Sequence, residues 1–313
     1  MRKTICILLA LGLMLGSALA LTGEWDAIAR VDGSEDTFLV RRDGLWGMID
    51  REGKVLIKPQ FDEEPEFSGG YAEVAVLDPN PRLGFSGEEE YGHFYGIVSV
   101  EGEIVVPPEY FSLQRSADGS MIRYELGETY HFLNLETGEK LPGSYDRAKD
   151  FVGDYAAVGM LGEQIEDNLS APEVVHWGTI DRSGKTGIPM DYDSLEVYED
   201  GIAIMELNRK HGYMHADGRE ITRCKYDFIH PFAHGVGIVG KIIGENESNN
   251  GSEPYISAWG AVDEEGNEIL PCEYDGLEVT NSGLIIADTG YKALWFEIKG
   301  GKAVPINEPS IAD

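Results

Sequence analysis

Residues 46–62 contain Trp46-Gly47-Met48-Ile49-Asp50, then Gly53, then Ile57-Lys58-Pro59, and finally Phe61-Asp62. The same phrase returns at Trp177 and at Trp259, with its glycine, its apolar–proline step and its aromatic–aspartate pair in the same order. Repetition of this kind is typical of repeat architectures, in which each unit is one small supersecondary structure. The phrase therefore predicts the architecture, and it argues against a single active site.

Each copy of the phrase predicts three short strands. Alternation puts Trp46, Met48 and Asp50 on one face of the first strand, and a tight turn follows in which a glycine takes a positive φ. The apolar stretch forms the second strand, which a proline ends because it cannot donate to a ladder. A third strand follows the aromatic–aspartate pair, as at 71–76. No long helical periodicity occurs after residue 20, so we expect an all-β protein.

The residues that carry the repeat are structural in this interpretation. The aromatic rings fill each unit against the next, and the aspartate after the aromatic residue bonds to nearby backbone N–H groups in a turn. Five units place the aromatic residue eight positions after the turn glycine, which indicates a fixed register. The predicted repeat residues are Trp46, Gly47, Gly53, Asp62, Gly96, Gly102, Tyr145, Asp146, Trp177, Gly178, Gly184, Tyr192, Asp193, Gly212, Gly218, Tyr226, Asp227, Trp259, Gly260, Gly266, Tyr274 and Asp275.

The two ends of the chain suggest how the array closes. Residues 294–305 supply the first two strands of a unit, and residues 25–40 supply the rest of another. Joined, they would complete a seventh unit, which is how a ring removes its open edges. We expect about seven short antiparallel units in a propeller-like ring. An open β solenoid, capped by two incomplete repeats, is the alternative.

The units alternate in length. Intervals between their equivalent positions are 49, 37, 45, 34, 48 and 36 residues, and the extra residues follow the third strand, in 78–93, 161–175 and 241–257. Insertions in repeat proteins map to one face, which is often the binding face. These three segments are therefore the candidates for specificity.

The N-terminus predicts export. Arg2 and Lys3 precede an apolar run over 5–15, and Ala18-Leu19-Ala20 supplies the small-residue cleavage pattern of a signal peptide. The apolar run is too short for a comfortable membrane span. We expect a signal peptide over 1–20, cleaved after Ala20, and a β domain over 21–313 that is secreted or retained in the cell envelope.

The composition limits the partners. The chain has 56 acidic and 25 basic residues, a net charge of −31, and 42% hydrophobic residues. Its charge repels nucleic-acid phosphate and anionic membranes, so we expect neither as a partner. The hydrophobic content is sufficient for a folded core, and the 39 glycines suit an array of tight turns.

The chemistry-bearing residues indicate no catalytic or metal site. His211 and His215 lie four positions apart on a strand, too far to share a zinc ion, and they replace motif residues. The run 88–90 of three glutamates lacks the spacing of a calcium loop. No nucleophile elbow, Walker loop or dinucleotide fingerprint occurs, and no cofactor is expected.

Two cysteines remain beyond the predicted signal peptide. Cys224 and Cys272 both stand two residues before the aromatic–aspartate pair of their units. Equivalent positions of neighbouring repeats usually lie beyond the roughly 7 Å between Cα atoms that a disulfide can bridge. We therefore expect two unpaired, half-buried thiols.

Tryptophan–glycine, Asp-x-x-Gly, apolar–proline and aromatic–aspartate, in this order, resemble the WG-repeat family, also called KWG repeats. The resemblance covers nearly all of the chain after residue 20, and it departs from the pattern at Tyr95, Leu133 and Phe111. It implies a mostly bacterial, often exported interaction or scaffolding module without a common set of catalytic residues.

These observations predict an exported, non-enzymatic repeat protein that binds a protein, peptide or glycan at the cell surface. An envelope-associated carbohydrate-active enzyme with a pair of carboxylates is the alternative, since such pairs act about 5–10 Å apart. A passive structural module that spaces other components is a third hypothesis.

Overall fold

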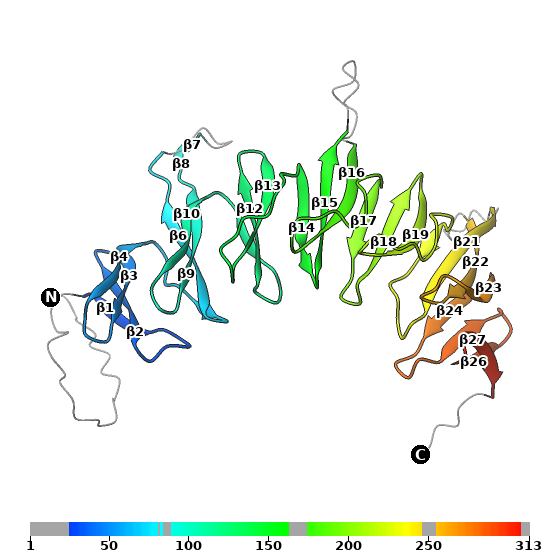
Figure 1. The fold of residues 1–313 in the computed structure, drawn as a ribbon. Coiled ribbons are helices and arrows are strands. Elements are labelled where there is room, and N and C mark those ends of the chain that lie inside the picture. Colours follow the sequence, from blue (N-terminus) through cyan, green and yellow to red (C-terminus); the bar gives the residue numbers. More distant parts are fainter. Residues whose placement is uncertain (1–24, 81, 84–88, 163–173, 246–254, 308–313) are drawn as a thin grey trace. The chain divides into compact units, whose positions relative to one another are not determined.

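The computed structural model of the protein describes residues 25–80, 82–83, 89–162, 174–245 and 255–307. Within these ranges the chain is all-β, without a helix, and forms seven small antiparallel sheets and one two-stranded ribbon (Figure 1). No helix that could cross a membrane occurs in this part of the chain. The predicted signal peptide, residues 1–20, lies outside the described residues.

The chain divides into two compact units, residues 1–109 and residues 110–313. The first unit holds two four-stranded sheets, of which the second ends with the first residue of the next unit. Its strands are β1 (Ala27–Arg30), β2 (Thr37–Arg42), β3 (Leu45–Asp50) and β4 (Val55–Phe61), then β5 (Phe67–Ser68), β6 (Tyr71–Leu77), β9 (His93–Ser99) and β10 (Ile104–Tyr110). The two-stranded ribbon pairs β7 (Arg82–Leu83) with β8 (Glu89–Glu90).

The second unit holds five sheets. Three of them are three-stranded: β11 (Leu113–Arg115), β12 (Met121–Leu126) and β13 (Thr129–Asn134); β14 (Arg147–Val152), β15 (Tyr155–Leu161) and β16 (Val175–Asp181); β17 (Ser194–Val197), β18 (Ile202–Leu207) and β19 (Lys210–His215). Two are four-stranded: β20 (Phe228–Ile229), β21 (Gly237–Glu245), β22 (Tyr255–Val262) and β23 (Glu268–Tyr274); β24 (Gly276–Val279), β25 (Ile285–Asp288), β26 (Ala293–Lys299) and β27 (Lys302–Ile306).

Each sheet is assembled across the boundary between two sequence repeats. The strand after the aromatic–aspartate pair forms one edge, the predicted third strand lies next to it, and the WG strand of the following repeat comes third. In the first sheet, for example, Arg41 of β2 lies opposite Trp46 of β3. The prediction grouped each WG strand with the third strand that follows it in the sequence, and this grouping is wrong. The chain crosses to the next sheet at the aromatic–aspartate turn, so the third strand pairs with the WG strand of the following repeat.

The two ends of the chain do not share a sheet. Residues 37–42 pair with residues 45–50 in continuous register, from Thr37 opposite Asp50 to Arg42 opposite Leu45. At the other end, β26 pairs with β25 and β27. The predicted seventh unit, built from 25–40 and 294–305, is therefore wrong, since each terminal segment already completes a sheet of its own.

The WG glycine allows the apolar–proline strand to pass close to it. Trp46 pairs with Phe61 and Met48 with Ile57, so three residues bulge opposite Gly47. A Cβ on Gly47 would lie 2.5 Å from the Ile57 carbonyl oxygen and 2.6 Å from the nitrogen of Pro59. Proline therefore does not end the strand as predicted; it lies inside the bulge, where its missing N–H costs no ladder hydrogen bond.

The same close approach recurs along the chain. A Cβ on the WG glycine would lie 2.4–2.7 Å from the carbonyl oxygen of the apolar strand at four further positions, which are Gly96, Gly178, Gly212 and Gly260. Real Cβ atoms do not approach backbone oxygen so closely, and the backbone cannot move away without breaking the sheet. The glycine of the WG pair is thus fixed by packing between two backbones.

Within each of the two units, the hydrophobic core lies between successive sheets. One cluster in the first unit joins Met48 and Phe61 of the first sheet to Val74 and Val98 of the second. Full burial of side chains of this size stabilises the fold by about 2 kcal/mol each. The Thr179 hydroxyl links neighbouring sheets of the second unit, because it donates to the Ala216 carbonyl oxygen at 2.7 Å.

Candidate functional site

The aromatic side chains of the repeat fall into two classes. Those before the aspartate are buried at Phe61 and Tyr226 and half-buried at Tyr192, and they lie opposite the aromatic residue of the WG strand. Burial raises the pKa of the Tyr226 phenol, as it does for Tyr145, Tyr192 and Tyr274. The indole of Trp46 is buried, whereas those of Trp177 and Trp259 are half-buried. The indoles of Trp177 and Trp259 therefore reach the surface of their sheets.

The aspartate of the pair accepts a hydrogen bond from a backbone N–H about fifteen residues further on, rather than from its own turn. Asp146 accepts from the Leu161 N–H at 2.7 Å, Asp193 from Asn208 at 2.7 Å and Asp227 from Ile242 at 3.0 Å. Each bond gives an acceptor to a backbone N–H group at the outer end of the third strand, where that strand enters its hairpin. The predicted role as a backbone acceptor is correct, but the N–H donor lies in the hairpin fifteen residues further on rather than in the turn of the aspartate.

The charge of Asp227 is stabilised where it lies. Burial alone would raise the pKa of its carboxyl group, but hydrogen bonds from the Lys210 ammonium and the Ile242 N–H lower it overall. The Lys210 nitrogen lies 2.5 Å from the carboxylate. Asp62 differs: its Oδ2 atom is buried without a hydrogen bond, 4.0 Å from the His93 Nε2 atom.

The turn glycines take the positive φ that the sequence predicted. Gly266 has a φ of 80° and closes its turn by donating to the Asp263 carbonyl oxygen at 3.0 Å. It also lies against the neighbouring sheet, since a Cβ there would be 1.9 Å from the Ile221 carbonyl oxygen. Its equivalents have φ values of 81–97° and are Gly53, Gly102, Gly184 and Gly218.

The hairpins between the third strand and the WG strand occur in two lengths, which alternate along the chain. Two of the short hairpins end in two-residue turns, Asp43-Gly44 and Asn208-Arg209, where both residues have positive φ, as type I′ turns require. Long hairpins connect β6 to β9, β15 to β16 and β21 to β22. They correspond to the predicted specificity segments, whose central residues lie partly outside the described ranges.

The residue opposite the WG aromatic ring differs between the two classes. In the long hairpins it is small, and a Cβ on Gly240 would lie 3.0 Å from the Trp259 ring. The indole therefore lies across the glycine and covers backbone that would otherwise be bare. The partners are Ala75, Gly159 and Gly240 in the long hairpins, against Arg41, Glu125, Glu206 and Ile286 in the short ones.

Exposed apolar side chains gather on the long hairpins. Of the sixteen large apolar residues that are exposed in the described part of the chain, nine lie at these three hairpins. Single exposed apolar residues are ordinary, but a group of them at one element marks an interaction surface. We call them the hairpin apolar residues: Leu77, Tyr91, Met160, Leu161, Val174, Ile242, Ile243, Tyr255 and Ile256.

Within the described ranges, the β21–β22 pairing extends further beyond its WG residue than that of the other long hairpins. Pairing between these strands continues from Trp259 outwards to Glu245 opposite Tyr255, with a bulge between Ile242 and Gly244. β23 reaches β22 only as far as Trp259, and β20 reaches β21 only as far as Gly240. The projecting part is thus a two-stranded ribbon that carries four of the hairpin apolar residues, of which Ile243 is 65% exposed.

An acidic pocket lies beside the first long hairpin. It has a volume of about 350 Å³ and is lined by Glu63, Glu64, Glu66, Glu73 and Tyr95, together with two apolar residues. Four glutamates in one hollow produce a negative potential that attracts cations. A second, more open hollow of about 570 Å³ lies between β24 and the exposed ring of Tyr291.

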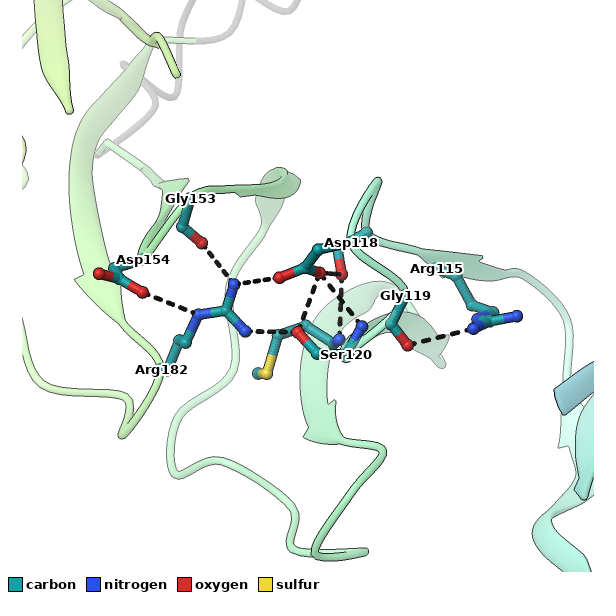
Figure 2. A network of polar contacts seen from close by, with 9 residues as sticks. Arg115, Asp118, Gly119, Ser120, Gly153, Asp154 and Arg182 are labelled. Carbon is teal, nitrogen blue, oxygen red and sulfur yellow. Dashed lines mark hydrogen bonds and ion pairs between the residues drawn. The ribbon is translucent and has the colours of Figure 1, made fainter. Parts of the chain in front are cut away.

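The densest polar network has a structural role. Figure 2 shows the Arg182 guanidinium between two neighbouring sheets, where it donates to Asp118 at 2.5 Å, to Ser120, to the Gly153 carbonyl oxygen at 2.7 Å and to Asp154 at 3.1 Å. Burial alone would raise the pKa of Asp118, but its hydrogen bonds lower it strongly. Each nitrogen of this guanidinium donates to at least one protein acceptor, so the network fastens two sheets together.

The remaining candidates from the sequence lie apart from one another. Cys224 and Cys272 are free and half-buried, and burial raises the pKa of the Cys224 thiol to about 11, which keeps it unreactive. No group of three histidine, cysteine or acidic side chains in the described ranges is arranged to hold a metal ion. His211 lies instead 3.8 Å from Glu206, and Glu88 is outside the described residues.

Two features of the long hairpins were not predicted from the sequence. The small partner of the WG ring depends on strand register, which the sequence does not display. The apolar residues were visible as Ile242-Ile243 and Tyr255-Ile256, on either side of a polar stretch. Their presence inside a segment expected to be a loop could have indicated a projecting ribbon.

Comparison with solved structures gives distant likenesses. A crystal structure of the eukaryotic initiation factor is 16% identical, with a TM-score of 0.35, over 91% of this chain and 76% of that chain. Dipeptidyl peptidase 4 from Porphyromonas gingivalis is 12% identical, with a TM-score of 0.34, over 89% of this chain and 52% of its own. Hsv2p from Kluyveromyces lactis is 12% identical, with a TM-score of 0.28, over 62% and 61%. No curated protein matches the chain.

A family model, described as the WG containing repeat, matches four stretches of the chain. These are residues 46–76, 177–210, 212–241 and 259–292. Each match begins at or within a WG strand and runs through the aromatic–aspartate turn into the next sheet, as the phase of the sheets requires. The chain therefore contains WG repeats at these four stretches, as its sequence predicted.

Proposed function

We propose that this protein is an exported, non-enzymatic binding module that holds a protein, peptide or glycan at the cell surface. The long hairpins make the contact, and the seven sheets act as the scaffold that carries them. The family match supports a repeat-containing β protein and names no catalytic activity. The export part of the proposal rests on the N-terminal sequence, with its charged start, apolar run and small-residue cleavage pattern.

One observation carries the proposal: nine of the sixteen exposed large apolar residues in the described ranges lie at the three long hairpins. Exposed apolar surface is costly in water, and soluble proteins that keep it at one element generally use it for contact. The four short hairpins carry only two of the sixteen, Leu126 and Tyr291, and the β18–β19 hairpin ends in the polar Asn208-Arg209 turn. Binding through insertions on one class of unit is also how repeat proteins commonly recognise partners.

The acidic pocket supports the enzymatic alternative, because it brings four glutamates together. A glycoside hydrolase would need two of them on opposite sides of a bound sugar. Both functions can be examined with the same purified protein. We would screen it against an array of peptides, an array of cell-wall glycans and a panel of chromogenic glycosides.

Saturable binding without turnover is the expected result. Turnover that disappears on a single substitution, such as Glu73→Gln, would instead establish an enzyme and overturn the proposal. Absence of both binding and turnover would favour a passive spacer. Export is tested separately by sequencing the N-terminus of the protein from the culture medium and envelope: a chain that begins at Leu21 is expected, and an uncleaved chain confined to the cytoplasm would contradict export.

A further inference from the structure

The projecting β21–β22 ribbon has an open edge along β22. Pairs beyond Trp259 connect Ala258 to Lys241 and Ser257 to Ile242, but no strand in the described part of the chain pairs with the other side of residues 255–258. Ribbons of two strands are marginally stable by themselves and present unpaired N–H and C=O groups. This edge is therefore a place where a further strand could add.

The direction of the free groups follows from the pairing. On β21, the Gly240 carbonyl oxygen accepts from Asp227, and the Ile242 N–H donates to the same residue, so both residues face β20. In an antiparallel pair the residues opposite them face the other way. Ser257, which lies opposite Ile242, and Tyr255 therefore direct their N–H and C=O groups outwards. They point to the side where β23 would lie if it continued beyond Tyr274.

Residues 255–258 themselves carry none of the protection that the other outer strands have. Natural sheets block their edges with proline, charge or bulges. Every outer strand that follows a WG strand in the four-stranded sheets contains proline, at Pro59, Pro107, Pro108, Pro271 and Pro305. Residues 255–258 are Tyr-Ile-Ser-Ala, with neither proline nor charge, and Tyr255 and Ile256 are 48% and 49% exposed.

The charges around the edge indicate what kind of strand would fit. Glu245, Glu273 and Asp275 are exposed at the two ends of the open edge. Basic residues at the ends of an incoming strand would complement them, and alternate apolar residues would pack on Ile242 and Tyr255. A second copy of this chain would instead bring a further net charge of −31, which opposes self-association.

We propose that the β22 edge, residues 255–258, binds an extended peptide segment of another protein by strand addition. The segment has apolar residues at alternate positions and lysine or arginine at its ends. The backbone hydrogen bonds of Tyr255 and Ser257 supply affinity, and the apolar side chains supply specificity. The inference rests on the proposed binding function and names its partner class.

The test uses the full mature protein and an array of seven-residue peptides with valine, isoleucine or phenylalanine at alternate positions and lysine at both ends. A second set has glutamate in place of lysine, and a third is N-methylated at the backbone positions that would bond to β22. The variant Ser257→Pro removes one outward N–H without touching the pairing with β21. The matched control, Ser257→Val, keeps that N–H.

The expected result is saturable binding of lysine-ended peptides, at least tenfold weaker binding of the glutamate-ended and N-methylated sets, and loss of about tenfold in affinity in Ser257→Pro but not in Ser257→Val. Amide exchange at residues 255–258 should slow when peptide binds. Circular dichroism and the melting temperature establish that both variants are folded. Binding by wild type that Ser257→Pro leaves unchanged would overturn strand addition.

The two proposals fail in different ways. If no peptide of the array binds, yet a glycan or folded protein binds with the same affinity to wild type and Ser257→Pro, strand addition is wrong and the binding function stands. If nothing binds in any array, the binding function itself is contradicted. A dimer that forms at micromolar concentration and is lost in Ser257→Pro would show that a second copy occupies the edge, and it would also overturn this proposal.

Discussion

The β18–β19 and β21–β22 hairpins are built on the same repeat and end differently. Both begin with a third strand, both are anchored by an aspartate that binds the outgoing strand, and both run into a WG strand. The first stops at the Asn208-Arg209 turn, with Glu206 opposite His211. The second continues into a ribbon, with a glycine opposite its aromatic ring and exposed apolar residues beyond it.

The comparison separates what holds the scaffold from what is free to vary. Features common to both hairpins, which are the WG glycine, the buried aromatic ring and the aspartate, are fixed by packing or hydrogen bonding. The features that only the long hairpins have are a small residue opposite the WG ring and a projecting pair of strands with exposed apolar residues. These features contribute little to the stability of the sheets. Substitutions should therefore be severe at the shared positions, whichever hairpin they follow, and mild for folding at the distinctive ones.

The largest loss of stability is expected on substitution of the WG glycine, equally at short and at long hairpins. A Cβ at Gly260 would lie 2.7 Å from the Leu270 carbonyl oxygen, and a Cβ at Gly212 would lie 2.7 Å from that of Thr222. Each alanine variant should lose about 3 kcal/mol or more in the free energy of unfolding, measured in denaturant. Gly92→Ala is the control, because nothing lies within 4 Å of its Cβ. If only one of the two variants, at the short or at the long hairpin, lost stability, the WG glycine would not have the same structural role in both types of hairpin.

A smaller loss is expected when the anchoring aspartate is removed. Asp227→Ala leaves the Ile242 N–H and the Lys210 ammonium without their acceptor, and should cost about 2 kcal/mol. Asp193→Ala, at the short hairpin, should cost a similar amount for its N–H bond. The measurement is chemical unfolding at neutral pH. If either variant is as stable as wild type, the aspartate does not anchor its hairpin.

The same aspartate gives a pH dependence with a definite sign. The pKa of Asp227 is lower in the folded protein than in the unfolded chain, so the folded state is stabilised above the unfolded pKa of about 4. That contribution disappears as the pH falls through the folded pKa. The difference in melting temperature between wild type and Asp227→Asn should therefore narrow on acidification, and a difference that widens would contradict this assignment.

A distinctive position of the long hairpins should have a milder effect. In Gly240→Ala the new methyl group would lie 3.0 Å from the Trp259 ring, which must move outwards by a few tenths of an ångström. We expect a loss of about 1 kcal/mol and a red shift of tryptophan emission. Glu206→Ala, at the equivalent place of the short hairpin, is the control and should change the free energy of unfolding by no more than about 0.5 kcal/mol.

The smallest effect concerns the Arg182 network, which belongs to neither class. Arg182→Gln removes the bonds to Asp118 and Asp154. Asp118 is half exposed, so screening should limit the loss to about 1 kcal/mol or less at neutral pH. Because the pKa of Asp118 is lowered on folding, this loss should fade as the pH falls below about 4, and urea unfolding at two pH values measures it.

The sequence predicted the strands and turns well because their causes are local. The turn glycine at 53 and the alternation in 46–50 act over a few residues, and the structure has them as expected. The predicted phase of the sheets and the predicted pairing of 25–40 were wrong because the repeated phrase marks the turns, whereas the sheets are set by which strands pair. The bonds of Asp146 and Asp227 span fifteen residues, so the sequence could indicate an acceptor but not its donor.

The sequence indicated where the candidate binding surface lies, but not that it is an apolar strand edge. The alternating intervals pointed to 241–257, and the structure places a projecting ribbon at both ends of that segment. That residues 255–258 form an open edge without proline follows only from the pairing of β23, which ends at Tyr274. Edge exposure is a property of neighbouring strands, which no local pattern records.

Converting a long hairpin into a short one tests the central claim most directly. Residues 242–257 would be replaced by Asn-Gly, so that Lys241 and Ala258 meet across a type I′ turn like that at Asn208-Arg209. The melting temperature should stay within a few degrees of wild type, and binding of peptides that wild type recognises should be lost. A trimmed chain that binds them with full affinity, or one that no longer folds, would contradict the division between scaffold and binding hairpin.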